Sequence, residues 1–247
     1  MFFTRLPLWR IHQPPQEHFR HVVHYWPFVG WLTGGAMALF FVLTAQMLPL
    51  SLALLLTIGG RILLTGALHE DGLADFCDGM GGGHTRERTL AIMKDSHIGT
   101  YGVLGLILYL LVLYHALHTL ALGSGEHLLV AAFLLTTDVW SKACASLLVG
   151  HLSYARPVQE VKSQVVYERL SWGAQALRTL LALLPVGAVW FVVGFPPPLP
   201  VFLIPLLIEG GLALWLHQRL GGYTGDCCGA TVLLCEVGMY LTWIICL

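Results

Sequence analysis

The sequence predicts an all-α integral membrane protein, a bundle of about seven transmembrane helices with its active site on the cytoplasmic face. Of the 247 residues, 56% are hydrophobic and only 11% are charged, and the mean hydropathy is +0.73. Soluble domains carry about 25% charged residues, so this chain has too few to cover a surface that faces water. Several apolar stretches also reach the roughly 20 residues that a helix needs to cross a bilayer. Membrane lipid is therefore the expected surrounding, and the net charge of −1 gives no case for nucleic acid as a partner.

Hydrophobic runs define the expected spans, with ends uncertain by a few residues. They lie at 28–47, 49–68, 100–122, 127–150, 179–195, 199–216 and 228–247. The joint after the first span is Leu48-Pro49, and the joint between the fifth and sixth is a triple proline, Pro196–Pro198. The prolines around the fifth and sixth spans leave a re-entrant pair as an alternative there.

Four polar segments separate these spans, at 1–27, 69–99, 151–178 and 217–227, and together with the spans they form one polytopic domain over 1–247. Threading seven spans puts all four segments on one face. All thirteen lysines and arginines except Arg61 and Lys142 fall in these segments. The positive-inside rule makes that face cytoplasmic and predicts a cytoplasmic (inner) membrane location. Within 151–178, a short amphipathic helix is expected around Val158–Leu170.

An acidic run, HEDGLADFCDG at 69–79, follows directly on the second apolar stretch. On a helix, Asp71, Asp75 and Asp78 fall within an arc of about 60° and extend over about 10 Å. Three like charges on one face would repel one another, which predicts a cation between them. Mg²⁺ fits, because it takes oxygen ligands and is commonly shared with a substrate phosphate. One ion on two of the aspartates is the simpler arrangement, and two ions bridged by Asp75 is the alternative.

The rest of segment 69–99 suits work on a phosphate-bearing substrate. Arg86 and Arg88 offer fork-shaped donors for phosphate, and Lys94 adds a point charge. Asp95 is a candidate metal ligand or general base for a hydroxyl nucleophile. The alternative for the two arginines is a solvated amphipathic helix at the lipid headgroups. His69 and His97, which bracket the segment, are candidates for orienting a carboxylate or touching phosphate.

Two further places carry polar side chains near the membrane. The run GGYTGD at 221–226 is a glycine-rich turn before a helix, so Thr224 and Asp226 are candidates for binding substrate. Arg61, two turns before the acidic run, would either face a substrate phosphate or bond to helix backbone. Lys142 follows Asp138 by four residues, so those two can pair on one helix face.

These motifs resemble, in order, those of the cobalamin synthase family, the adenosylcobinamide-GDP ribazoletransferases. The run from Gly66 to Gly79 resembles the family's most specific motif, and IMKDS (92–96) and GTYG (99–102) follow it. FTRLP (3–7), PFVG (27–30), YAR (154–156) and GGYTGD (221–226) extend the resemblance over nearly the whole chain. The chain departs from the family pattern at Cys227-Cys228, Lys142 and His97, which puts substrate contacts there in doubt.

The resemblance implies a reaction with two small-molecule substrates. A hydroxyl of α-ribazole, or of its 5′-phosphate, attacks the cobinamide-linked phosphoryl of adenosylcobinamide-GDP, and GMP leaves. Mg²⁺ would neutralise charge on the pyrophosphate. By motif position, Asp71, Asp75 and Asp78 would hold metal, and Asp95 would be ligand or base. Lys94, Arg86 and Arg88 would contact phosphates.

Two other functions compete with this interpretation. CDP-alcohol phosphotransferases also use aspartates to bind metal and also act at the membrane. Their motif, however, has Arg where this chain has Asp75 after Ala74. A carboxylate-lined cation transporter would place its acidic residues near the membrane centre and often has repeats, and no repeat is visible here. The oligomeric state stays open, with a homo-oligomer as one alternative.

Overall fold

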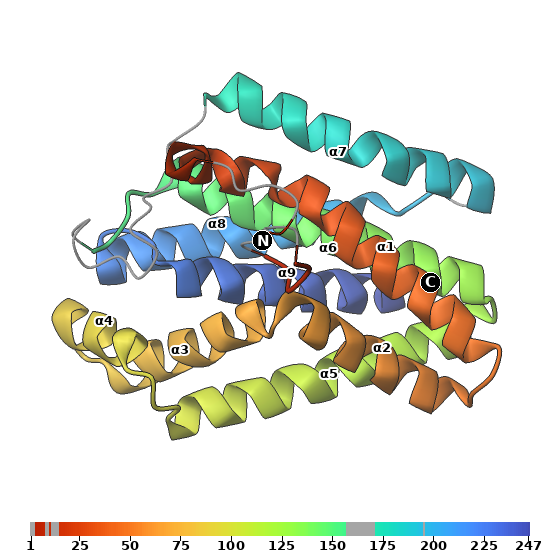
Figure 1. The fold of residues 1–247 in the computed structure, drawn as a ribbon, viewed down its shortest axis with the longest axis horizontal. Helices are drawn as coiled ribbons and strands as arrows, with labels where there is room; N and C mark the ends of the chain where they lie inside the picture. Colours follow the sequence, from red (N-terminus) through yellow and green to blue (C-terminus); the bar gives the residue numbers. More distant parts are fainter. Residues whose placement is uncertain (1–2, 8–9, 11–14, 157–170, 195) are drawn as a thin grey trace.

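A computed structural model describes residues 3–7, 10, 15–156, 171–194 and 196–247, and these are helical apart from short connections (Figure 1). The helices are the 3-10 helix η2 (Gln16–Tyr25) and the α-helices α1 (Trp26–Ala45), α2 (Leu50–Thr65), α3 (Leu68–Gly82), α4 (Arg86–Lys94), α5 (Thr100–Ser124), α6 (His127–His151), α7 (Trp172–Val193), α8 (Leu199–Leu220) and α9 (Gly225–Cys246). The predicted all-α class is confirmed.

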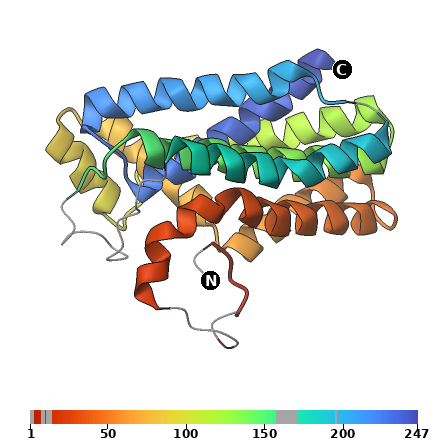
Figure 2. The same ribbon diagram turned by 90° about the horizontal axis from the view of Figure 1, so that it is seen from above.

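Long apolar helices carry the chain back and forth along the bundle. Six segments are long and apolar enough to cross a membrane, and the bent pair α2 and α3 makes a seventh when counted as one span. In Figure 1 the long helices lie roughly side by side, and the view from above in Figure 2 shows the same arrangement. The prediction of about seven spans is therefore confirmed. Since α7 and α8 are both full-length candidates, the structure favours two separate spans there over a re-entrant pair.

The second span is broken, which the sequence did not predict. The chain turns by 87° between α2 and α3. The two residues at the turn, Gly66 and Ala67, both have left-handed backbone conformations, with φ of 68° and 58°. By itself α2 is about 24 Å long, short of the roughly 30 Å hydrocarbon core. The acidic run therefore lies on a helix of its own, α3, which follows the bend.

The N-terminal segment covers this break. The backbone N–H of Arg5 donates to the carbonyl oxygen of Leu64 in the last turn of α2, at 2.7 Å. A Cβ at Gly66 would lie 2.6 Å from Nε of Arg5, so the close approach needs glycine as well as the positive φ. Broken helices at membrane depth occur where protein covers the exposed backbone, and this contact supplies part of that cover.

The helix α6 lies at the centre of the bundle, and α1 packs closely on it. A Cβ at Gly30 would lie 2.7 Å from Cα of Val139, and one at Gly34 would lie 2.9 Å from Cβ of Asp138. Glycines four residues apart allow this approach in membrane helices. Beside it, Asp138 accepts hydrogen bonds from Lys142 and from the Thr33 hydroxyl, all fully buried. The predicted pairing of Asp138 with Lys142 is confirmed.

Helix ends differ from the expected spans on the face predicted to be cytoplasmic. The helix α7 begins at Trp172, so residues 172–178 belong to it and not to a loop. The helix α8 continues to Leu220 and α9 starts at Gly225, so only 221–224 connect them. The amphipathic helix expected around Val158–Leu170 lies outside the described residues.

Candidate active site

The helix α3 carries the three aspartates, and their exposure falls along it. Asp71 is exposed, Asp75 is half-buried and Asp78 is buried, with 7% of its surface accessible. The helix ends at Gly82, as the glycine run predicts. A Cβ at Gly79 would lie 3.1 Å from the carbonyl oxygen of Thr89, so this glycine lets α4 pack against α3.

The carboxylate of Asp78 caps the N-terminus of α5. Its Oδ2 accepts the backbone N–H of Gly99 at 2.6 Å, and its Oδ1 accepts that of Gly102 at 2.8 Å. The first N–H groups of a helix have no partner within it, and the helix dipole favours a negative charge there. A Cβ on Gly99 or Gly102 would fall within 2.5 Å of these oxygens. Asp78 therefore joins α3 to α5, and both of its oxygens are already hydrogen-bonded.

A pocket of about 320 Å³ opens beside Asp78, between α3, α4 and the start of α5. Four of the predicted site residues line it: Asp78, Arg88, Asp95 and His97. Thr100 and Tyr101 at the start of α5 complete the polar wall, and they belong to the GTYG motif. The pocket combines an arginine, carboxylates and a histidine, a set that suits a phosphate-bearing ligand. Lys94 ends α4, one residue before Asp95.

Asp95 is held by its neighbour His97. Its Oδ1 lies 2.7 Å from Nδ1 of His97 and 3.0 Å from the backbone nitrogen of that residue. The hydrogen bond from the imidazole, with the one from the backbone N–H, lowers the pKa of Asp95. Asp95 is thus ionised at neutral pH and oriented at the rim of the pocket.

The C-terminal motif lies against the acidic helix. A Cβ at Gly72 would come within 3.1 Å of the carbonyl oxygen of Asp226, so α3 and α9 approach closely at this point. Thr224 caps α9 by accepting the N–H of Cys227 at 3.4 Å, and its hydroxyl donates to Asp226 Oδ2 at 3.2 Å. The predicted glycine-rich turn before a helix is confirmed, and Thr224 and Asp226 lie next to the acidic helix.

The motif around Tyr154 joins the same region. Tyr154 and Tyr223 form an isolated parallel β-bridge, with Tyr223 N donating to Ser153 O at 2.9 Å. Arg156, which the sequence did not single out as a site residue, is buried, and its Nη2 lies 3.8 Å from Asp226 Oδ2. The YAR motif was the signal that could have placed it here.

Arg86 is bound to backbone. Its Nε donates to Leu220 O at 2.7 Å and its Nη2 to Ala155 O at 2.6 Å. Arg219 makes a similar link from the end of α8 to Gly83 O. Arg86 therefore ties α4 to the end of α8, and the structure does not bring it into the pocket with Arg88.

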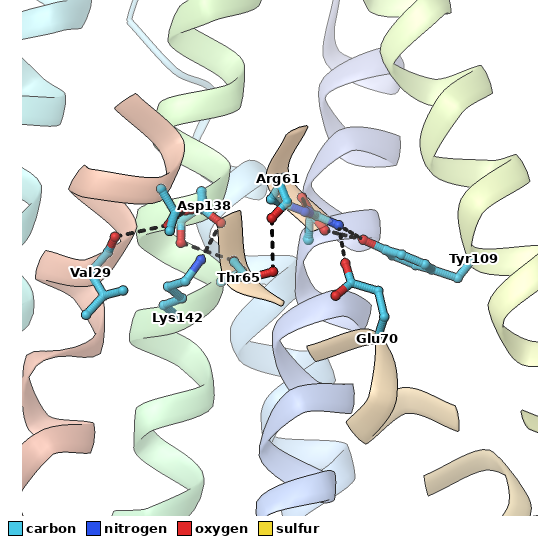
Figure 3. A network of polar contacts seen from close by, with 10 residues as sticks. Val29, Arg61, Thr65, Glu70, Tyr109, Asp138 and Lys142 are labelled. Carbon is cyan, nitrogen blue, oxygen red and sulfur yellow. Dashed lines mark hydrogen bonds and ion pairs between the residues drawn. The ribbon is translucent and has the colours of Figure 1, made fainter. Parts of the chain in front are cut away.

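Arg61 and His69, also predicted to bind substrate, are buried. The guanidinium of Arg61 donates to Glu236, to Glu70 at 3.0 Å and to the Tyr109 hydroxyl (Figure 3). Only 4% of the surface of each of Arg61 and His69 is accessible. Nε2 of His69 has no hydrogen-bond partner in the part of the chain that the structure describes. Arg61 therefore neither binds helix backbone through its guanidinium nor faces the pocket.

Asp71 and Asp75 are the candidate carboxylates for Mg²⁺ among the described aspartates of α3. Among the described residues, no group of three His, Cys, Asp or Glu side chains is arranged to hold a metal. Asp71 and Asp75, one turn apart on one helix face, are both accessible from solvent. Mg²⁺ usually keeps several waters and uses one or two carboxylates together with substrate phosphates. Both oxygens of Asp78 are hydrogen-bonded to the start of α5, so Asp78 is a poorer candidate for a metal ligand than the sequence predicted.

Comparisons with known proteins give one family. The family model described as cobalamin-5-phosphate synthase matches residues 1–244. An adenosylcobinamide-GDP ribazoletransferase of Leptothrix cholodnii is 38% identical, over 98% of this chain and 92% of the relative. Proteins of the same name from Shewanella amazonensis and Vibrio cholerae are 36% and 38% identical, each over 97% of this chain and 90% and 89% of the relative. No solved structure matches the chain.

Proposed function

The chain belongs to the cobalamin-5-phosphate synthase family, and we propose that it joins adenosylcobinamide-GDP to α-ribazole or its 5′-phosphate. The products would be adenosylcobalamin, or its 5′-phosphate, and GMP. The observation that carries this proposal is the 33–38% identity to ribazoletransferases over nearly the whole chain. It favours this enzyme over the CDP-alcohol phosphotransferase and the cation transporter.

The transfer needs one bond made and one broken at the same phosphorus. A hydroxyl oxygen of the ribazole forms a bond to the phosphorus that carries the cobinamide. The bond from that phosphorus to the oxygen bridging the diphosphate breaks, and GMP leaves with the electron pair. The hydroxyl proton must pass to a base. Asp95, ionised and oriented by His97, is the candidate at the pocket rim.

The residues around the pocket would then divide the work. Arg88, Lys94 and His97 would bind the diphosphate, whose charge grows on the leaving GMP. Thr224 and Asp226 would contact the second substrate from the start of α9. Asp71 and Asp75 would hold Mg²⁺, which would offset the negative charge of the diphosphate. Asp78 would keep the start of α5, and with it Thr100 and Tyr101, in place.

The site would face the cytoplasm of a cell with an inner membrane, since the cationic segments lie on that side by the positive-inside rule. Two exposed positions at opposite ends of the long helices test this orientation. A cysteine at His84, after α3, should react with a membrane-impermeant reagent only from the cytoplasmic side. A cysteine at Glu126, between α5 and α6, should react only from outside. The reverse pattern would contradict the orientation.

Purified protein in lipid vesicles tests the reaction. We expect GMP and a new corrinoid only when adenosylcobinamide-GDP, α-ribazole 5′-phosphate and Mg²⁺ are all present. A chelator should stop both products, and added Mg²⁺ should restore them. Turnover of a CDP-alcohol lipid by the same preparation, with no corrinoid product, would move the assignment to the other enzyme class.

A further inference from the structure

The direction of the acidic helix depends on the break between α2 and α3. The 87° turn rests on two residues, Gly66 and Ala67, in left-handed conformations. No helix hydrogen bonds run straight through such a turn, so contacts outside the turn must hold its angle. A change in this angle or in the rotation of α3 would move every aspartate on its surface.

One side chain spans the break. Arg61 lies one turn before the end of α2, and its Nη2 donates to Oε1 of Glu70 in the first turn of α3 at 3.0 Å. The other oxygen of Glu70 has no hydrogen-bond partner among the described residues. Within the described chain, Arg61 is thus the ion-pair partner of Glu70, as Figure 3 shows.

The same guanidinium is held in turn by two other helices. It pairs with Glu236 on α9 and donates to the hydroxyl of Tyr109 on α5. That hydroxyl donates to the second oxygen of Glu236 at 2.7 Å. All four side chains are at most 6% exposed. A charged hydrogen bond in such a dry interior is strong and directional, so the position of Glu70 is set relative to α5 and α9.

Fixing Glu70 also fixes the rotation of α3. Glu70 lies about 80–140° round the helix from the three aspartates at 100° per residue. With Glu70 turned into the bundle, Asp71 is exposed and Asp75 half-buried. We infer that Arg61 is the positioning residue of the acidic helix, since its pairing with Glu70 across the break sets the rotation of α3 that leaves the Asp71 and Asp75 carboxylates accessible on its surface. This inference rests on the proposed function for the meaning of the aspartates.

The decisive comparison is between removing one partner and removing both. Arg61→Leu leaves Glu70 without a partner in the interior, so the break should open or α3 should rotate. Arg61→Leu with Glu70→Leu removes both charges of the pair across the break, and two leucines of similar size can keep α2 and α3 in contact. Glu236 loses its ion pair with Arg61 in both variants and keeps the hydrogen bond from the Tyr109 hydroxyl in both, so the two variants differ only at Glu70. If Arg61 instead bound phosphate directly, both variants would lose the same activity.

The structural readout is a spin-label distance that needs no substrate or metal. Labels at Leu55→Cys on α2 and Glu87→Cys on α4 report the angle, after Cys77 and Cys246, the two half-buried cysteines, are replaced by alanine. We expect one narrow distribution in the parent, a broader or shifted one with Arg61→Leu, and a narrow one again in the double variant. An unchanged distribution with Arg61→Leu would overturn the inference. If Arg61→Leu does not accumulate in membranes, Glu70→Gln, which keeps the shape and weakens the pair, replaces it with the same expectation.

The kinetic readout separates positioning from a general loss of fold. Arg61→Leu should lower kcat at least tenfold and raise the Mg²⁺ concentration for half-activation, with less than a twofold change in the KM for adenosylcobinamide-GDP. The kcat of the double variant should be at least fivefold higher than the kcat of Arg61→Leu. As a control, Glu209→Gln weakens a part-buried contact of 3.1 Å between Glu209 on α8 and His151 on α6, neither of which belongs to the break. It should leave Mg²⁺ activation unchanged. A double variant as inactive as Arg61→Leu overturns the inference, while an inactive parent refutes the proposed function and leaves the distance result to decide.

Discussion

Replacing Asp78 by alanine should destabilise the protein far more than the same change at Asp71. Asp78 is 7% exposed and accepts two backbone hydrogen bonds at the start of α5. A hydrogen bond to a charged group contributes about 1.5–3 kcal/mol, so the loss of both costs about 3–6 kcal/mol. For a chain of this size, each kcal/mol shifts the Tm by about 2–4 °C, so the Tm should fall by about 6–24 °C. Asp71 is exposed, and its removal should change stability by no more than about 0.5 kcal/mol.

Thermal unfolding in detergent micelles, followed by a dye that reacts with the buried thiols as they become exposed, measures both variants. The ribazoletransferase assay at a temperature where both are folded gives the second comparison. We expect Asp71→Ala to lose Mg²⁺-dependent turnover with an unchanged Tm, and Asp78→Ala to show the large Tm loss. Equal Tm values for Asp78→Ala and the parent protein would refute the capping role of Asp78.

Four further substitutions test other parts of the site. Gly102→Ala places a Cβ 2.4 Å from the same carboxylate, so it should cost about 1–3 kcal/mol in thermal unfolding; no loss would mean that α5 can shift freely. Arg86→Met should lower the Tm by several degrees because two backbone carbonyls lose their donor, while Arg88→Met should raise the substrate KM at unchanged Tm; equal KM effects would show that Arg86 binds substrate. Because His97 lowers the pKa of Asp95, their contact stabilises the fold above the ordinary aspartate pKa and is lost as pH falls through the lowered value. His97→Ala should therefore raise the carboxyl titration midpoint in ¹³C NMR, and an unchanged midpoint would contradict the assignment.

The apolar spans and the placement of charge predicted the order of the helices, but hydropathy did not predict the bend between α2 and α3. Threading seven apolar spans predicted which polar segments share a face, and the lysines and arginines outside the spans all fall in those segments. The structure has long helices for these spans, with the second divided into α2 and α3. The stretch that ends at Leu68 is apolar enough over its whole length to be predicted as one span, in spite of Arg61, so hydropathy gives no sign of the turn at Gly66 and Ala67. Their conformations depend on Arg5, some sixty residues earlier, which packs against the turn. Such a contact leaves no pattern in the sequence around the turn.

The spacing of the aspartates predicted their helix and their shared face, because both follow from 3.6 residues per turn. It could not show that Asp78 would be hydrogen-bonded, since its donors lie at Gly99 and Gly102 on another helix. For Arg61, the sequence suggested a phosphate or helix backbone. Its partners come from across the break and from Glu236, 175 residues away, so only the tertiary fold brings them together.

The proposed Mg²⁺-dependent ribazole transfer depends on the acidic face of α3. Asp75→Asn removes one carboxylate charge from this face, and Glu126→Gln, in the exposed turn between α5 and α6, is the control. In vesicles with both substrates, we expect the control to release GMP and form corrinoid product at the parent rate. Asp75→Asn, assayed at a temperature where it is folded, should lose at least 100-fold in rate at fixed Mg²⁺. Full activity of Asp75→Asn, with the parent's Mg²⁺ dependence, would contradict the claim.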